Sequence, residues 1–229
     1  MNKLSCKIGY WASLSIAFIF IIWLLSYIAI SLTSPQFYWI NYADYLLYIK
    51  NNNQFFQHLA RFLMLLFGPL FVVFINSFYE LVPPGKRVLV RLGIFFSLAF
   101  AILSSLHYFV QLSMVRMNIL RGATDGLEHF VQSNPYSLST SIDMLAWTLF
   151  LGISSACMAP AFSGDRIQLV IRYAFMGNAI SCLMAGIGYM FKIDIMTFFF
   201  INIGVGGALL TISIASSMLF KNLGGLQFD

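Results

Sequence analysis

Apolar residues along the chain form six long stretches that are separated by charged and turn-forming residues. An α-helix needs about 20 residues to cross the ~30 Å hydrocarbon layer of a bilayer, and each stretch is close to that length. None of them alternates between apolar and polar residues as the strands of a membrane β-barrel do. The pattern predicts an all-α, polytopic membrane protein with a six-transmembrane-helix bundle, over residues of about 9–32, 58–80, 90–115, 141–162, 167–190 and 195–219.

Composition leads to the same class of protein. Hydrophobic residues make up 60% of the chain and charged residues only 9%, whereas a soluble domain carries about 25% charged residues. The predicted spans use up nearly the whole chain, so we expect a single integral membrane domain over residues 1–229. The three cysteines, Cys6, Cys157 and Cys182, are odd in number and form no CxxC pair. Neither a disulfide framework nor a cysteine-based zinc site is therefore indicated.

The positive charge of the chain is explained by topology. The basic residues stand singly or in pairs between apolar stretches instead of forming one basic face, so no nucleic-acid partner is expected. Lys and Arg concentrate in cytoplasmic loops of membrane proteins. An N-terminus inside the cell puts most of the 13 basic residues on the inner side: Lys3, Lys7, Lys86, Arg87, Arg91, Arg166, Arg172 and Lys221. We therefore expect both termini to be cytoplasmic, in a cell membrane such as a bacterial inner membrane.

The two long connections both fall on the predicted outer side. The first opens with Ser34-Pro35, a plausible helix start. Tyr38, Tyr42, Tyr45 and Ile49 then recur at helical spacing. Tyrosine is favoured where hydrocarbon meets water, so this segment is predicted to be a short amphipathic interfacial helix.

Small residues recur every four positions in several spans, for example at Ser97, Ala101 and Ser105. Such stripes let membrane helices approach closely, and they predict a tightly packed bundle. They are equally compatible with a homo-oligomer or with a partner membrane subunit. Gly68-Pro69 near the middle of the second span removes a backbone hydrogen bond and is expected to disturb that helix.

Polar residues inside the spans are the best guide to function, because each is costly in hydrocarbon unless it is paired. Ser104, His107 and Gln111 share one face of the third span, at the depth where the second span begins with Arg61 and the fourth with Asp143. These five residues predict an outward-facing polar pocket that binds a ligand. Alternatively, the histidine and the glutamine only fasten helices together, and Asp143 only stabilises a helix N-terminus.

Two more specific chemistries have weak support. His58, His107 and His129 are all predicted on the outer side, so a metal or a haem between spans is geometrically possible. No HxxxH or HExxH motif accompanies them, and neither a metal nor another cofactor is predicted. A serine hydrolase built on His107 and Asp143 would lack the GxSxG element.

The sequence leaves three functions open. The first is a non-enzymatic protein that holds or translocates a small apolar or amphiphilic, lipid-like molecule through the outward-facing pocket. The second is a membrane-embedded enzyme acting on a lipid-like substrate, with His107 as acid or base, because histidine titrates near neutral pH. The third is a membrane subunit of a larger complex. In all three the lipid bilayer is the immediate partner.

Overall fold

The computed structural model describes residues 3–225, and over these residues all regular structure is helical. It contains six helices long and apolar enough to cross a membrane, which confirms the predicted number of spans. Three spans each consist of a single helix: α1 (Lys3–Thr33), α3 (Phe55–Ser77) and α8 (Arg166–Met190).

The other three spans are built from consecutive helical segments. The third comprises η1 (Pro84–Lys86), α4 (Arg87–Val110), η2 (Gln111–Val115) and α5 (Arg116–Arg121). The fourth comprises α6 (Leu138–Leu145), η4 (Ala146–Phe150), α7 (Leu151–Met158) and η5 (Ala159–Ala161). The sixth comprises α9 (Asp194–Phe198), η6 (Phe199–Val205) and α10 (Gly206–Gly224). Outside the spans lie α2 (Tyr42–Asn51) and η3 (Leu127–His129).

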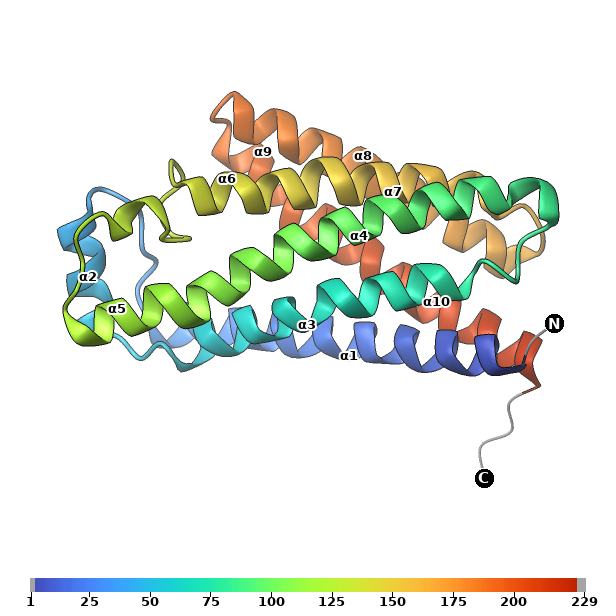
Figure 1. Ribbon diagram of the computed structural model, residues 1–229, viewed down its shortest axis with the longest axis horizontal. Helices are drawn as coiled ribbons and strands as arrows, with labels where there is room; N and C mark the ends of the chain where they lie inside the picture. The colour runs from blue at the N-terminus through green and yellow to red at the C-terminus, as the bar shows by residue number, and fades with distance from the viewer. Residues whose placement is uncertain (1–2, 226–229) are drawn as a thin grey trace.

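The spans form a closed ring in which each packs against its neighbours in the sequence. α1 packs on α3, α3 on α4, α4 on α7, α7 on α8, α8 on α10, and α10 returns to α1. Successive spans run in opposite directions, so the start of α1 and the end of α10 lie together at one end of the bundle (Figure 1). We call this the termini end, and the opposite end, where α2 lies, the α2 end.

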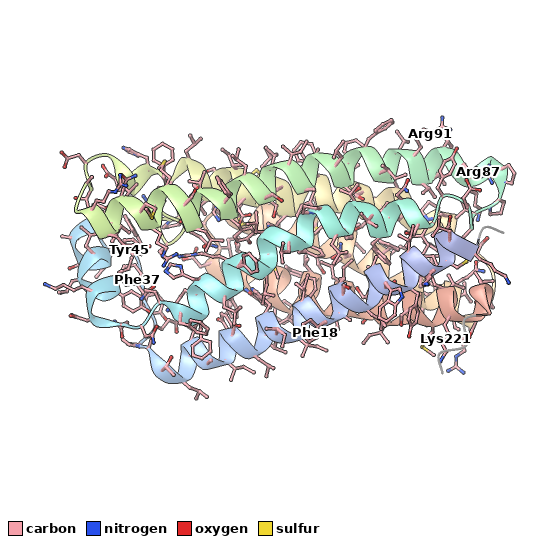
Figure 2. The ribbon with its side chains drawn as sticks, turned by 60° about the horizontal axis from the view of Figure 1, so that its bottom comes forward. Phe18, Phe37, Tyr45, Arg87, Arg91 and Lys221 are labelled. Carbon is pink, nitrogen blue, oxygen red and sulfur yellow. The ribbon has the colours of Figure 1, made fainter. Side chains whose placement is uncertain are left out.

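Basic and aromatic side chains mark the two ends of the bundle. Arg87, Arg91 and Lys221 lie at the termini end, whereas Phe37 and Tyr45 lie at the α2 end (Figure 2). The cytoplasmic location of the termini end, which rests on the distribution of basic residues, stays a prediction.

Aromatic rings fill the interior of the ring. Phe67, Phe71 and Phe74 repeat along the inner face of α3, Phe78 follows directly after it, and none of the four is more than 1% exposed. Edge contacts and tilted stacking bring Phe78 together with Phe162 after the fourth span, Phe175 of the fifth and Phe220 of the sixth. Rings near Phe67 come from the first, third and fourth spans: Phe20, Phe100 and Trp147. Such pairs contribute beyond their buried area, so the phenylalanine row of α3 holds the spans together.

Pro69 lies inside α3 without ending it. A proline has no N–H, so the carbonyl of Leu65, four residues earlier, loses its helical partner. The hydroxyl of Ser105 on α4 donates to this carbonyl, with 3.3 Å between the oxygens. A serine that the sequence assigns to a packing stripe thus also supplies the hydrogen bond that the proline removes.

The substitution Ser105→Ala should lower the free energy of unfolding by about 1 kcal/mol, because it leaves the Leu65 carbonyl unpaired. In a Pro69→Ala background the same substitution should cost little, since the restored N–H can bond Leu65. Ser97→Ala is the matched control, because the Ser97 hydroxyl bonds a carbonyl of its own helix, that of Ile94. Unfolding in mixed micelles measures all four variants. Equal costs of Ser105→Ala in both backgrounds would contradict the compensation.

The helix of the first long connection begins later than predicted. α1 continues to Thr33, so Ser34-Pro35 does not open α2. Instead Asn41 caps α2: its side chain accepts a hydrogen bond from the Asp44 backbone N–H at 2.9 Å and donates to the Asp44 carboxylate at 2.7 Å. These two hydrogen bonds give the Asp44 N–H, which has no partner within the helix, an acceptor. They explain why α2 begins directly after Asn41.

The aromatic face of α2 packs against other parts of the chain. This packing explains its tyrosines in addition to the predicted preference for a membrane interface. Tyr45 is 3% exposed and forms a small second core with Val115, Leu127 and Val131. Phe37 and Trp39 from the extended segment before α2 pack against it. α2 therefore covers the α2 end of the third span.

Titration of Tyr42 tests whether α2 is docked in this way. Burial, followed by the negative charges of Tyr45 and Glu128, raises the pKa of Tyr42 to about 12. In an undocked helix the pKa would be near 10. Because the raised pKa belongs to the folded state, docking should be fully stable below pH ~10 and weaken as the pH rises from ~10 to ~12. Tyrosinate absorbance of the protein, compared with that of Tyr42→Phe, should show one group titrating in that upper range; a normal titration would argue against docking.

Candidate functional site

A cavity of about 310 Å³ lies in the half of the bundle near the α2 end. Its walls come from α1, from the first turns of α3, and from the junction of η6 with α10. Most of the lining is apolar and aromatic, including Phe20, Trp23, Tyr27, Met64 and Trp147. A few polar side chains interrupt this surface: Gln57, Arg61, Tyr108, Gln132, Asp143 and Asn202. An apolar cavity with a few converging polar groups is the usual form of a small-molecule site.

Three spans change to π-helical geometry close to this cavity. The segments are η2, η4 and η6, and each belongs to a different span. η4 contributes Trp147 to the lining, and η6 contributes Ile201, Asn202 and Val205. A π-helical turn holds an extra residue and shifts the side chains that follow, and such turns are frequent at functional sites. Two of the three segments thus line this cavity, whereas Gln111 and Val115 of η2 line a second cavity beneath α2.

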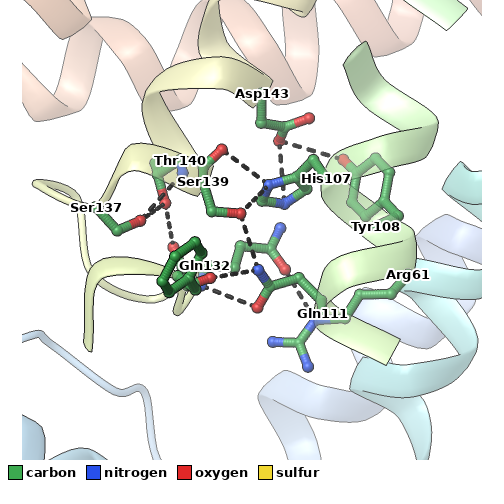
Figure 3. A network of polar contacts seen from close by, with 10 residues as sticks. Arg61, His107, Tyr108, Gln111, Gln132, Ser137, Ser139, Thr140 and Asp143 are labelled. Carbon is green, nitrogen blue, oxygen red and sulfur yellow. Dashed lines mark hydrogen bonds and ion pairs between the residues drawn. The ribbon is translucent and has the colours of Figure 1, made fainter. Parts of the chain in front are cut away.

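Asp143 belongs to a buried polar network (Figure 3). Its Oδ2 lies 3.6 Å from Nε2 of His107 and 3.5 Å from the hydroxyl of Tyr108. Nδ1 of His107 lies 2.9 Å from the backbone oxygen of Ser139. The hydroxyl of Ser139 also lies 2.9 Å from Nδ1. A carbonyl can only accept, so a proton on Nδ1 satisfies the contact with the backbone oxygen. The second ring nitrogen faces the Asp143 carboxyl group and has no hydrogen-bond partner within the described residues.

Gln111 bonds the second long connection, residues 122–137 between α5 and α6, to the bundle (Figure 3). Its amide nitrogen donates to the Phe130 carbonyl at 2.6 Å and to the Ser139 hydroxyl at 3.0 Å. Its amide oxygen accepts from the Gln132 backbone N–H at 3.0 Å. Arg61 donates from Nε to the Gln132 side chain at 2.8 Å, which holds the guanidinium beside the cavity.

The five predicted site residues end in different surroundings. Arg61 and Asp143 line the cavity. His107 and Gln111 are buried in the network behind its wall, where they fasten helices and the connection together. Ser104 is buried, and its hydroxyl has no hydrogen-bond partner among residues 3–225.

The alternative role of Asp143 as a stabiliser of a helix N-terminus is wrong. Ser137 is the N-cap of α6, and its hydroxyl accepts from the Thr140 backbone N–H at 3.1 Å. Asp143 lies in the second turn, where its carboxyl group contacts side chains of α4 instead of free N–H groups.

Several polar atoms on the cavity wall are buried without a hydrogen-bond partner in the described part of the chain. They are both amide atoms of Gln57, Oδ1 of Asp143 and Nε1 of Trp147. Native structures rarely leave such groups unpaired. The sequence pattern does not single out Gln57, Tyr108, Gln132 or Trp147, because each lies in or beside a stretch typical of an ordinary span or loop. Their location on one wall points to a polar group of a ligand.

The three histidines lie in separate surroundings. His107 is in the network, His58 faces a second cavity beneath α2, and His129 is exposed beside Glu128, with 3.7 Å between its Nε2 and the carboxylate. Within residues 3–225, no three His, Cys, Asp or Glu side chains converge as metal ligands would.

Comparison of the chain with family models, with curated proteins and with solved structures finds no match. Function must therefore be argued from the cavity and the network.

Replacing Gln111 should loosen the connection that closes this end of the bundle. Gln111→Leu removes three hydrogen bonds and leaves backbone groups of Phe130 and Gln132 unpaired, which should lower the free energy of unfolding by about 1–3 kcal/mol. Hydrogen exchange of the Gln132 amide should accelerate. Asn118→Leu is the control, because Asn118 in the same span bonds only the carbonyl of Met114 in its own helix. Equal exchange in the two variants would show that Gln111 does not hold the connection.

Proposed function

We propose that this chain is a multi-pass cell-membrane protein that holds or translocates a small amphiphilic, lipid-like molecule in the cavity between α1, α3 and η6. One observation carries the proposal: Gln57 Oε1 and Nε2, Asp143 Oδ1 and Trp147 Nε1 belong to residues of one mostly apolar wall, and these buried atoms have no hydrogen-bond partner within the described residues. A ligand with an apolar body and a polar head would fill the volume and satisfy these atoms.

The position of the cavity suits a ligand that comes from the bilayer. α1 packs closely along α10, but it has no comparably close packing with η6. Tyr27 of α1 lines the cavity and is also 37% exposed. The cavity thus reaches the lipid-facing surface between α1 and η6, and about 310 Å³ holds only part of a long acyl chain. The remainder of the chain would stay in the bilayer.

An enzyme acting on a lipid-like substrate is a second candidate, favoured by the His107–Asp143 pair. His107 itself does not line the cavity, so a proton from it would reach a ligand through Asp143. This assigns the contact with substrate to Asp143 and a positioning role to His107. A role as a subunit of a larger complex rests only on the small-residue stripes.

Filling the cavity should remove the ligand. Gly206 lines it, and a Cβ added there meets no atom within 4 Å, so Gly206→Leu projects into free volume. Gly207→Leu is a matched control: a Cβ there is equally unobstructed, but the residue lines a groove on the outer surface of α8 and α10. Native mass spectrometry of the purified protein should find a retained non-covalent mass in the wild type and in Gly207→Leu. Its occupancy should fall by about tenfold or more in Gly206→Leu, because the leucine excludes the ligand sterically.

Equal occupancy in all three proteins would reject this cavity as the binding site. A lipid extract that changes mass during incubation, and does so only when Asp143 is intact, would favour the enzyme. A stoichiometric second chain would favour the complex subunit.

A further inference from the structure

A second cavity, of about 270 Å³, lies beneath α2 at the end of the bundle. α2 contributes Tyr45 and Ile49, the start of α3 contributes His58 and Arg61, and α5 contributes Arg116. We propose that this cavity binds a phosphate group, as carried by an anionic lipid headgroup. The proposal does not depend on a ligand in the larger cavity.

The charges around this cavity are all of one sign. Arg61 and Arg116 line it together with His58, and no lining residue is an aspartate or a glutamate. Neither arginine lies within 4 Å of a carboxylate of the described chain. Arg61 is half-buried and Arg116 is exposed, and both carry a positive charge beside the cavity. A bound anion would be attracted by both charges.

The donors fit an oxyanion. Arginine presents several N–H groups in a planar fork that matches phosphate oxygens. Arg61 is held in place by the hydrogen bond from its Nε to Gln132. This bond uses only one of the N–H groups of the guanidinium. Nδ1 of His58 is buried and has no hydrogen-bond partner in the range 3–225. A phosphate would give this nitrogen a partner as well.

The depth of the cavity distinguishes a lipid headgroup from other phosphates. It lies where α3 begins and where α5 ends the third span, which is the level of headgroups if the spans cross a bilayer. Its lining continues into Ile119 and Leu120, and Leu120 is 71% exposed. An acyl chain attached to the phosphate could follow these side chains to the surface.

The test compares three probes on the purified protein: a lysophosphatidic acid, the monoacylglycerol with the same acyl chain, and inorganic phosphate. The lysophosphatidic acid should bind at least about tenfold more tightly than the neutral lipid, because only it carries the charge that two guanidinium groups recognise. Arg116→Gln should reduce this preference by about tenfold. Arg121→Gln, which removes a charge from the same helix without altering the lining of the cavity, should leave the preference intact.

Repeating the titration with Gly206→Leu separates the two proposals. Binding that keeps its phosphate preference in this variant belongs to the cavity beneath α2, even if the larger cavity holds nothing. No preference for phosphate in the wild type, or an equal loss in Arg116→Gln and Arg121→Gln, would overturn the inference. Competition by inorganic phosphate at equal concentration would retain the phosphate site but overturn its assignment to a lipid headgroup.

Discussion

The requirement that every buried polar group find a partner governs this structure. Most intramembrane hydroxyl groups meet it locally: Ser13 and Ser26 donate to the carbonyls of Gly9 and Ile22, one helical turn earlier. Where proline breaks a helix, Ser105 supplies the missing bond from the neighbouring span. Such bonds let polar residues lie in apolar surroundings at little cost. The places where the requirement is not met are therefore informative, and they are concentrated near the α2 end of the ring.

The two ends of the ring differ in how their interior is filled. Towards the termini end, Phe78 packs against Phe162, Phe175 and Phe220, and these rings close the interior. Towards the α2 end, three spans contain π-helical segments. The space between them is occupied in part by the His107–Asp143 network and in part by the cavity. Two of the π-helical segments, η4 and η6, line that cavity, and η2 supplies Gln111 to the neighbouring network.

The spans could be predicted because a segment that crosses hydrocarbon must be a long helix of apolar residues. The polar face of the third span was visible for the same reason. The end of that span was placed too early: Arg116 carries a charge but is exposed, so the helix continues to Arg121. Asp143 was open to a helix-capping role because its neighbours offered the right spacing, and only the fold shows Ser137 in that role. Gln57 and Trp147 could not be recognised, because their convergence depends on how α3 packs against the fourth span, and Trp147 lies in a π-helical segment that hydrophobic periodicity does not encode.

Arg61 links the two cavities, and its surroundings explain why their charges differ. In the larger cavity the one carboxyl group, that of Asp143, faces His107. In the smaller cavity Arg61 and Arg116 have no such compensation. The guanidinium of Arg61 is fixed by Gln132, whose backbone is fixed in turn by Gln111 and Thr140. The connection that closes the α2 end therefore sets the position of the Arg61 charge between a cavity that contains a carboxyl group and one that contains none.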